Sequence, residues 1–178
     1  KKDFFKSKII FDTAPSLEAQ IASISDDIAY NNHDLEDGLR AGLFSIKEIG
    51  RIPYTSKLIN KHIRNLKRFR KEIIISQIVR DLINIMVLDV LETTKKNLER
   101  IKPRSINSIY KQDHLIVDFS DNMKIFDKQM KDFLKTNMYN HKMVIANTNK
   151  GKTIIDALFK YLSKNSKKYI SKELFKNE

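Results

Sequence analysis

The stretch from Lys71 to Ile101 constrains the fold most, because its pattern is that of one long, unbroken helix. Apolar residues recur in it at three- and four-residue steps, which places them on one helical face. They are Ile74, Ile78, Leu82, Ile85, Leu88 and Leu91, and the face is widened by Ile75, Val79, Met86 and Val90. We expect Asp81 and Asp89 at the edge of this stripe and Pro103 to end the helix. So broad a stripe predicts a central core helix.

The rest of the chain also favours helices, since only 4 glycines and 3 prolines interrupt its 178 residues. Pro15 and Ser16 are typical of a helix start, and Ser120 can cap a later helix. The elements predicted besides 71–101 are five helices. The first covers about 16–32 or extends to 38, and the second lies between the glycines at 42 and 50. The others start at Pro53 and cover about 121–136 and about 153–162. The residues from 105 to 120 are expected to form a connection with one short extended piece. The fold class predicted is all-α.

Composition narrows the possible partners and compartments. The chain carries 34 Lys and Arg against 22 Asp and Glu, a formal charge of +12, and such a surface attracts nucleic acid, nucleotides or anionic membranes. A solvated lysine-rich surface explains the same charge without any ligand. The chain has no cysteine, which excludes disulfides and thiolate metal sites and suits the cytoplasm. No apolar run reaches about 18 residues, so no transmembrane helix is expected, and the predicted partners do not include a membrane.

An acidic stripe lies on the first predicted helix, in the stretch "DDIAYNNHD". At helical spacing, Asp26, Tyr30 and Asp34 fall within about 80° of one another. The apolar residues of the same helix lie at about 160–220° from Asp26, on the opposite face. The stripe is therefore either the solvated side of an amphipathic helix or the wall of a cleft. In a cleft, its oxygen atoms would suit Mg²⁺ or Mn²⁺ and a hydroxylated, phosphorylated substrate.

The blocks "SLEAQIASISDDIAYNNHDLEDGLRAGL", "IVRDLINIMVLDVLETT", "LIVDFSDNMK" and "FLKTNMYNHKMV" together resemble the deoxyguanosine-triphosphate triphosphohydrolase-like proteins of the HD superfamily. The resemblance implies part of an HD-type multi-helix domain and a divalent metal. It also implies hydrolysis of a deoxynucleoside triphosphate to deoxynucleoside and triphosphate. Self-association into a homo-oligomer is implied as well.

The family resemblance also implies roles for single residues. In that family, two histidines and two aspartates hold the metal. The second aspartate is the first residue of a D-x-x-x-Y-x-x-x-D pattern. Here that pattern is Asp26, Tyr30 and Asp34, which implies Asp26 as metal ligand and catalytic residue. Tyr30 and Asp34 would contact the sugar and phosphates of the nucleotide. We expect the acids of this stretch to face metal and substrate rather than salt-bridge partners.

The other three metal ligands have no match in the chain. His33 and Asp34 are adjacent but fall about two turns beyond Asp26, on the substrate side. The remaining histidines are not followed by aspartate; they are His62, His114 and His141. The chain begins with Lys1, so we expect upstream sequence. Residues 1–178 are predicted to be the C-terminal portion of a single domain without its upstream ligand segment, and inactive alone.

Two other segments could bind phosphate. The basic cluster "KHIRNLKRFRK", 61–71, offers Lys67, Arg68 and Arg70 as substrate contacts, unless it is a solvated helix face. The segment "ANTNKGKT", 146–153, ends like a P-loop but lacks the first glycine, so a helix start capped near Asn149 is the alternative. His141 is expected to pack or cap a helix.

Two alternatives to the hydrolase remain open. One is a helical module that binds nucleic acid or nucleotides without catalysis, and the other is a degenerate fragment that keeps the fold without the metal. Salt-sensitive DNA binding that is unaffected by Asp26→Ala would favour the binding module.

Overall fold

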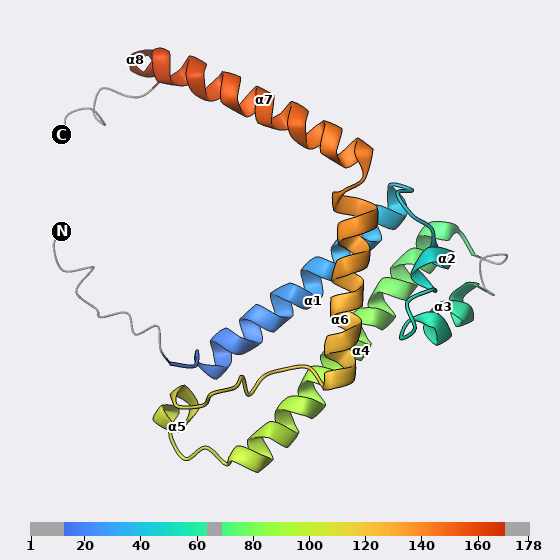
Figure 1. Cartoon of the computed structure of the whole chain (residues 1–178), viewed down its shortest axis with the longest axis vertical. Coiled ribbons are helices and arrows are strands. Elements are labelled where there is room, and N and C mark those ends of the chain that lie inside the picture. Colours follow the sequence, from blue (N-terminus) through green and yellow to red (C-terminus); the bar gives the residue numbers. More distant parts are fainter. Residues whose placement is uncertain (1–12, 64–68, 170–178) are drawn as a thin grey trace. The chain divides into compact units, whose positions relative to one another are not determined.

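The computed structural model describes residues 13–63 and 69–169, and every element within these ranges is a helix. This confirms the all-α prediction. The chain divides into two compact units, residues 1–134 and 135–178, which are described separately below. Figure 1 labels the helices in chain order.

The first unit contains six helices within its described part. They are α1 (Leu17–Arg40), α2 (Ile46–Ile49), α3 (Ser56–Ile63), α4 (Lys71–Ile101), α5 (Ile106–Tyr110) and α6 (Asp121–Leu134). The 31-residue helix α4 has the predicted bounds, and α1 extends a little beyond its expected end. The connection at 105–120 contains the short helix α5 instead of the expected extended piece. There, Ser105 and Ser108 cap the turn reciprocally and so favour a helix.

Serine side chains fix two helix starts, as the sequence predicted. The hydroxyl oxygen of Ser16 accepts a hydrogen bond from the Ala19 N–H at 3.3 Å, and that of Ser120 accepts one from the Met123 N–H at 3.3 Å. At the end of α4, Lys102 adopts a left-handed conformation with φ of 46°, directly before Pro103. The helix stops there because proline cannot continue it.

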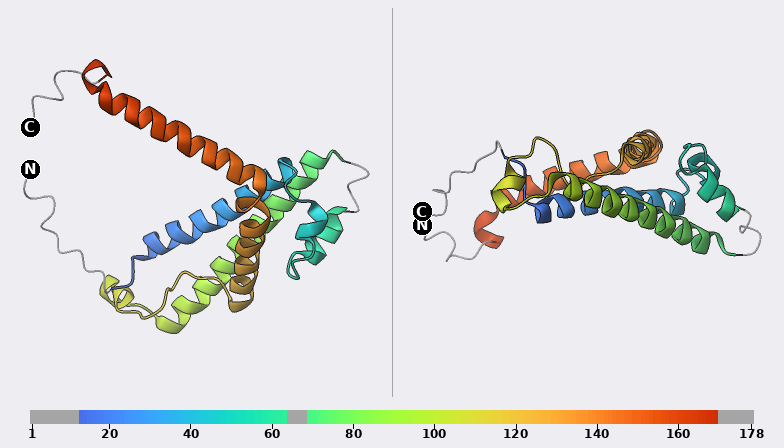
Figure 2. Two further views of the ribbon diagram at one scale, coloured as in Figure 1. Left: turned by 45° about the horizontal axis from the view of Figure 1, so that its top comes forward. Right: turned by 90° about the horizontal axis from the view of Figure 1, so that it is seen from below.

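The core of the first unit lies where α1 and α4 run side by side in opposite directions, with α6 packed against α1 (Figures 1 and 2). The buried apolar side chains of these helices are Ile28, Leu35 and Leu39 from α1, Ile74, Ile75, Ile78, Val79, Leu82, Met86 and Val90 from α4, and Met123, Phe126, Met130 and Leu134 from α6. The broad stripe predicted on α4 is therefore only partly core. Leu88 and Leu91 were expected to be buried but are 55% and 61% exposed, because α1 covers a narrower band.

A close helix–loop contact depends on Gly38 of α1. A Cβ atom at this position would lie 2.3 Å from the ring of Phe44. Phe44 is itself buried and packs edge-on against Phe133 of α6, with ring centroids 4.9 Å apart. The missing side chain lets the chain after α1 fold back onto α6.

Glu36 joins α1 to α4. Its Oε1 accepts hydrogen bonds from Arg40 Nη2 at 2.6 Å and from the hydroxyl of Ser76 at 3.1 Å. The hydrogen bond from Arg40 lowers the pKa of the Glu36 carboxyl, partial burial opposes this shift, and Ser76 adds to it.

Glu36→Gln is expected to lower the free energy of unfolding by about 0.5–1.5 kcal/mol at neutral pH. Since the folded-state pKa lies below the ordinary 4.5, the difference from wild type should exist above that pH and vanish as the pH falls through the lowered value. Urea unfolding at neutral pH and at about pH 2 measures it. The control is Glu92→Gln, whose exposed pair with Lys96 on α4 should contribute nothing measurable. If the difference in unfolding free energy between Glu36→Gln and the wild type is as large in acid as at neutral pH, the ionised Glu36 carboxylate is not its source.

The second unit contains the π-helix η1 (Lys135–Tyr139), α7 (Lys142–Lys164) and α8 (Ser166–Tyr169) within its described part. The expected start of the last helix, near residue 153, is wrong by more than two turns. His141 caps α7 by accepting a hydrogen bond from the Met143 N–H at 3.3 Å. Helix capping was one of the two roles predicted for this residue. Residues 146–153 lie inside this helix, so both the P-loop and the helix start near Asn149 are wrong.

Candidate metal and nucleotide site on α1

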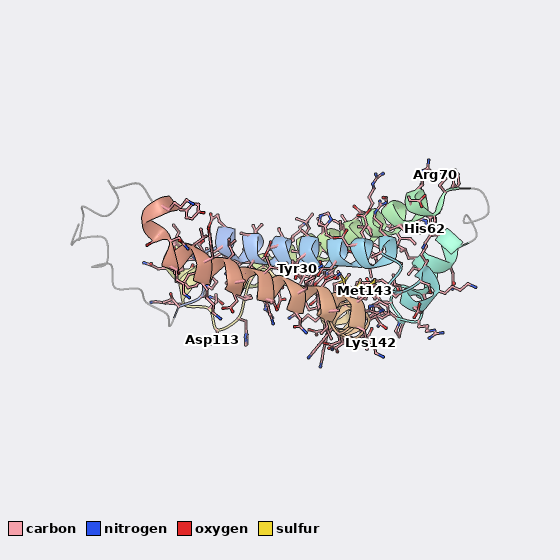
Figure 3. All side chains as sticks on the ribbon, turned by 90° about the horizontal axis from the view of Figure 1, so that it is seen from above. Tyr30, His62, Arg70, Asp113, Lys142 and Met143 are labelled. Atoms are coloured by element: carbon pink, nitrogen blue, oxygen red, sulfur yellow. The ribbon has the colours of Figure 1, made fainter. Side chains whose placement is uncertain are left out.

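The acidic stripe lies on an accessible face of α1. Asp26 is exposed, Tyr30 is 59% exposed and Asp34 is half-buried. Their i, i+4, i+8 spacing sets successive members of the stripe about 6 Å apart along the helix axis. On the opposite side, Ile28 and Leu35 are buried in the core. The predicted separation of an acidic face and an apolar face is confirmed, and Figure 3 marks Tyr30 on α1.

The neighbouring acid Asp27 has an ion-pair partner, contrary to expectation. Its carboxylate lies 3.3 Å from Lys131 Nζ of α6, and the same ammonium group lies 2.8 Å from Asp127. Asp127 also accepts a hydrogen bond from Asn31 at 3.1 Å. Burial alone would lower the pKa of Lys131, but the hydrogen bonds and charges of Asp127 and Asp27 outweigh it and raise the pKa. α6 thus places a cation beside the stripe, which the sequence did not reveal because Asp27 and Lys131 are 104 positions apart.

Asp26 differs from Asp27 in its surroundings. Within the described residues it has no hydrogen-bond or ion-pair partner, and no three His, Cys, Asp or Glu side chains gather closely enough to hold a metal ion. Asp26 can supply one oxygen ligand, but a metal needs more donors. The described residues alone therefore do not fit the implied metal.

A groove of about 280 Å³ opens next to Asp27, between α1, the segment before α6, and α6 itself. Its polar lining consists of Gln20, Ser23, Asp27, Asp118, Lys124 and Asp127. Lys124 pairs with Asp118, so the cations bordering this groove are already neutralised by carboxylates.

The basic cluster is only partly described. Lys67 and Arg68 lie outside the described residues, so their substrate contacts remain a prediction. Arg70 directly precedes α4 with its side chain 82% exposed, and its Nε lies 3.7 Å from the Glu72 carboxylate (Figure 3). It is accessible to an anion.

His62, from the same cluster, has a structural position. It is 5% exposed, and its Nε2 lies 2.8 Å from Asp81 Oδ2, which links α3 to α4 (Figure 3). Its Nδ1 is buried and has no hydrogen-bond partner within the described residues. Asp81 is half-exposed, at the edge of the α4 stripe as predicted.

No helix within the described ranges has both the length and the apolar character needed to cross a bilayer.

Two comparisons with known proteins support the resemblance, one with a family model and one with curated relatives. Residues 117–177 match the model of a phosphohydrolase-associated domain. The chain is also similar to deoxyguanosinetriphosphate triphosphohydrolase-like proteins of three bacteria. The identity is 42% to that of Pelagibacter ubique, over 98% of this chain and 47% of the relative. The protein of Bartonella tribocorum is 37% identical, over 86% of this chain and 38% of the relative. That of Brucella anthropi is 40% identical, over 81% of this chain and 36% of the relative.

The chain thus spans about half the length, or less, of the curated relatives that it matches. The match to the associated domain is consistent with the C-terminal part of such a protein. The chain is therefore similar over most of its length to the deoxyguanosinetriphosphate triphosphohydrolase-like proteins, and its all-α fold is consistent with an HD-type helical domain.

Proposed function

We propose that the intact protein is a metal-dependent hydrolase that converts a deoxynucleoside triphosphate to deoxynucleoside and triphosphate, and that this chain alone is inactive. The observation that carries the proposal is the exposed carboxylate of Asp26, which has no partner among the residues that the structure describes and shares one accessible face with Tyr30 and Asp34. That face belongs to a chain 42% identical, over nearly its whole length, to a relative named for this activity.

Each residue of the stripe has a role that its chemistry allows. Asp26 would give one oxygen ligand to Mg²⁺ or Mn²⁺, with the remaining ligands coming from outside this chain. The Tyr30 hydroxyl can donate a hydrogen bond to a phosphate or sugar oxygen, and the Asp34 carboxylate can accept one from a sugar hydroxyl. Lys67, Arg68 and Arg70 would meet the triphosphate as cations. We also propose that the intact protein is a homo-oligomer and that it is located in the cytoplasm.

A second candidate function is supported by charge. The formal charge of +12 suits a module that binds nucleic acid or nucleotides without hydrolysis. Its binding should weaken steeply as the salt concentration rises and should not depend on Asp26.

The test is release of triphosphate from a mixture of deoxynucleoside triphosphates with Mg²⁺ or Mn²⁺. It uses the full-length product of the gene that encodes this chain, beside its Asp26→Ala form. Asp113→Ala, which removes an exposed loop carboxylate, is the control (Figure 3).

Triphosphate from the wild type and the control, and none from Asp26→Ala, is the expected result. Equal activity in all three proteins would remove Asp26 from the site. No release by any of them, together with salt-sensitive DNA binding that Asp26→Ala leaves unchanged, would favour the binding module.

A further inference from the structure

Acidic side chains crowd the face of α1 that carries the candidate site. At about 100° per residue, Asp27 lies only about 20° from Asp34 around the helix, and Asp37 lies about 20° from Asp26. These carboxylates therefore share a sector of about 100°. Asp34 is half-buried and the other three are exposed. Such a concentration of negative charge repels a substrate that carries a triphosphate.

Helix α1 cannot balance this charge from its own sequence. It contains no lysine, and its one arginine, Arg40, is its last residue and bonds to Glu36. The neighbouring helix α6 supplies a cation instead. The Lys131 ammonium group lies 3.3 Å from the Asp27 carboxylate and 2.8 Å from the Asp127 carboxylate, so it bridges the two. The Asp27 side chain is 57% exposed and that of Asp127 only 13%, so Asp27 is the carboxylate of this bridge that a ligand in solution meets.

The two helices are joined at this point without help from Lys131. Asn31 lies one turn beyond Asp27 on α1, is 4% exposed and donates a hydrogen bond to Asp127 Oδ1 at 3.1 Å. This nearly buried contact connects α1 to α6 directly, whereas the ion pair of Lys131 with Asp27 is exposed to water and holds the helices weakly. What the ammonium group adds is positive charge beside the acidic stripe.

We propose that Lys131 is a positioning residue of the candidate site, which neutralises Asp27 and Asp127 and so keeps the acidic face of α1 open to a polyanionic substrate. The inference rests on the proposed function, because it takes that substrate to be a deoxynucleoside triphosphate. It requires no contact between Lys131 and the substrate, since charges interact over several ångströms. Without the ammonium group, two carboxylates beside the stripe would lose their counter-charge.

A double-mutant cycle tests the inference in the full-length product of the gene that encodes this chain. Lys131→Met removes the cation but keeps an apolar stem of similar length. Asp27→Asn removes the exposed carboxylate, and the double variant removes both charges. Lys131→Arg keeps the positive charge. The control is Lys96→Met, because Lys96 also forms an i, i+4 ion pair, with Glu92 on the exposed side of α4.

The measurement is KM and kcat for hydrolysis of a deoxynucleoside triphosphate at low and at high salt. Lys131→Met is expected to raise KM about tenfold at low salt and to leave kcat within about twofold, because the repulsion acts alike on bound substrate and transition state. About 0.5 M salt should screen the repulsion and reduce the increase to about threefold or less. Asp27→Asn alone should lower KM, while Lys131→Arg and Lys96→Met should keep it within about twofold of the wild type.

The double variant distinguishes a role of charge from a role in structure. If Lys131 acts through the charge of Asp27, the double variant should regain most of the affinity that Lys131→Met loses. If Lys131 only joins the helices, or itself binds the triphosphate, the double variant should be at least as impaired as Lys131→Met. That result would overturn the inference, and so would an unchanged KM in Lys131→Met or a raised KM in Asp27→Asn.

A binding measurement separates this inference from the proposed function. The affinity of the same proteins for inorganic triphosphate, measured by calorimetry, repeats the cycle without hydrolysis. The expected order of affinities in a protein that hydrolyses no deoxynucleoside triphosphate would support the role of Lys131 and contradict the proposed function. Hydrolysis with the same KM in every variant would do the reverse. A wild-type protein that neither binds triphosphate nor hydrolyses the nucleotide would overturn both.

Discussion

Replacing Phe126 with alanine is expected to lower the free energy of unfolding by about 3–5 kcal/mol. Phe126 is 1% exposed at the centre of α6, and its ring stacks on Tyr54 with centroids 4.8 Å apart and an interplanar angle of 24°. The change removes a buried ring and leaves a cavity that rigid helices cannot fill by relaxing. The contact also tethers the segment between α2 and α3 to α6, so that segment should loosen first.

Urea unfolding followed by circular dichroism measures this change, and Ile125→Ala is the matched control. Ile125 is the preceding residue of the same helix, has similar size and is 57% exposed, so its truncation should cost at most about 0.5 kcal/mol. Small domains have a total stability of only about 5–15 kcal/mol, so Phe126→Ala should leave much of the chain unfolded at moderate urea. Equal effects of the two substitutions would show that the α6 face is not packed as described.

Local chemistry explains what could be predicted from the sequence. The bounds of α4 and the caps at Ser16 and Ser120 depend on residues within a few positions of one another. The spacing of Asp26 and Tyr30 on one helix also follows from local geometry. These parts of the fold and of the candidate site needed no tertiary information.

The wrong predictions concern long-range contacts and marginal local signals. Which part of the α4 stripe is buried depends on where α1 lies, and the pattern cannot show this for Leu91. The pairing of Asp27 with Lys131 likewise depends on how α1 and α6 pack. α7 begins much earlier than expected because residues 142–152, although mostly exposed, continue the helix after the His141 cap.

Replacing Gln20 with methionine is expected to lower the free energy of unfolding by about 2–4 kcal/mol. The Gln20 side chain is 3% exposed. Its Oε1 accepts hydrogen bonds from the N–H groups of Ile116 and Val117 at 2.9 and 3.0 Å, and its Nε2 donates to the Pro15 carbonyl at 2.8 Å. Methionine has nearly the same length and is apolar, so it preserves packing but leaves two buried N–H groups without acceptors.

The loss should concentrate where those N–H groups lie. Hydrogen exchange of the Ile116 and Val117 amides should accelerate more in Gln20→Met than exchange at the centre of α4, because these two amides lose their acceptor directly. Gln129→Met on α6 is the control: Gln129 is half-buried, so the same chemical change orphans no backbone group described here and should cost at most about 0.5 kcal/mol. If both substitutions prove equally mild, water must replace Gln20 as the acceptor, and the segment at 116–117 is held by its apolar side chains. If the predicted loss is found, one side chain of α1 fixes the segment 96 positions away that leads into α6, and so helps to place Lys131 beside Asp27.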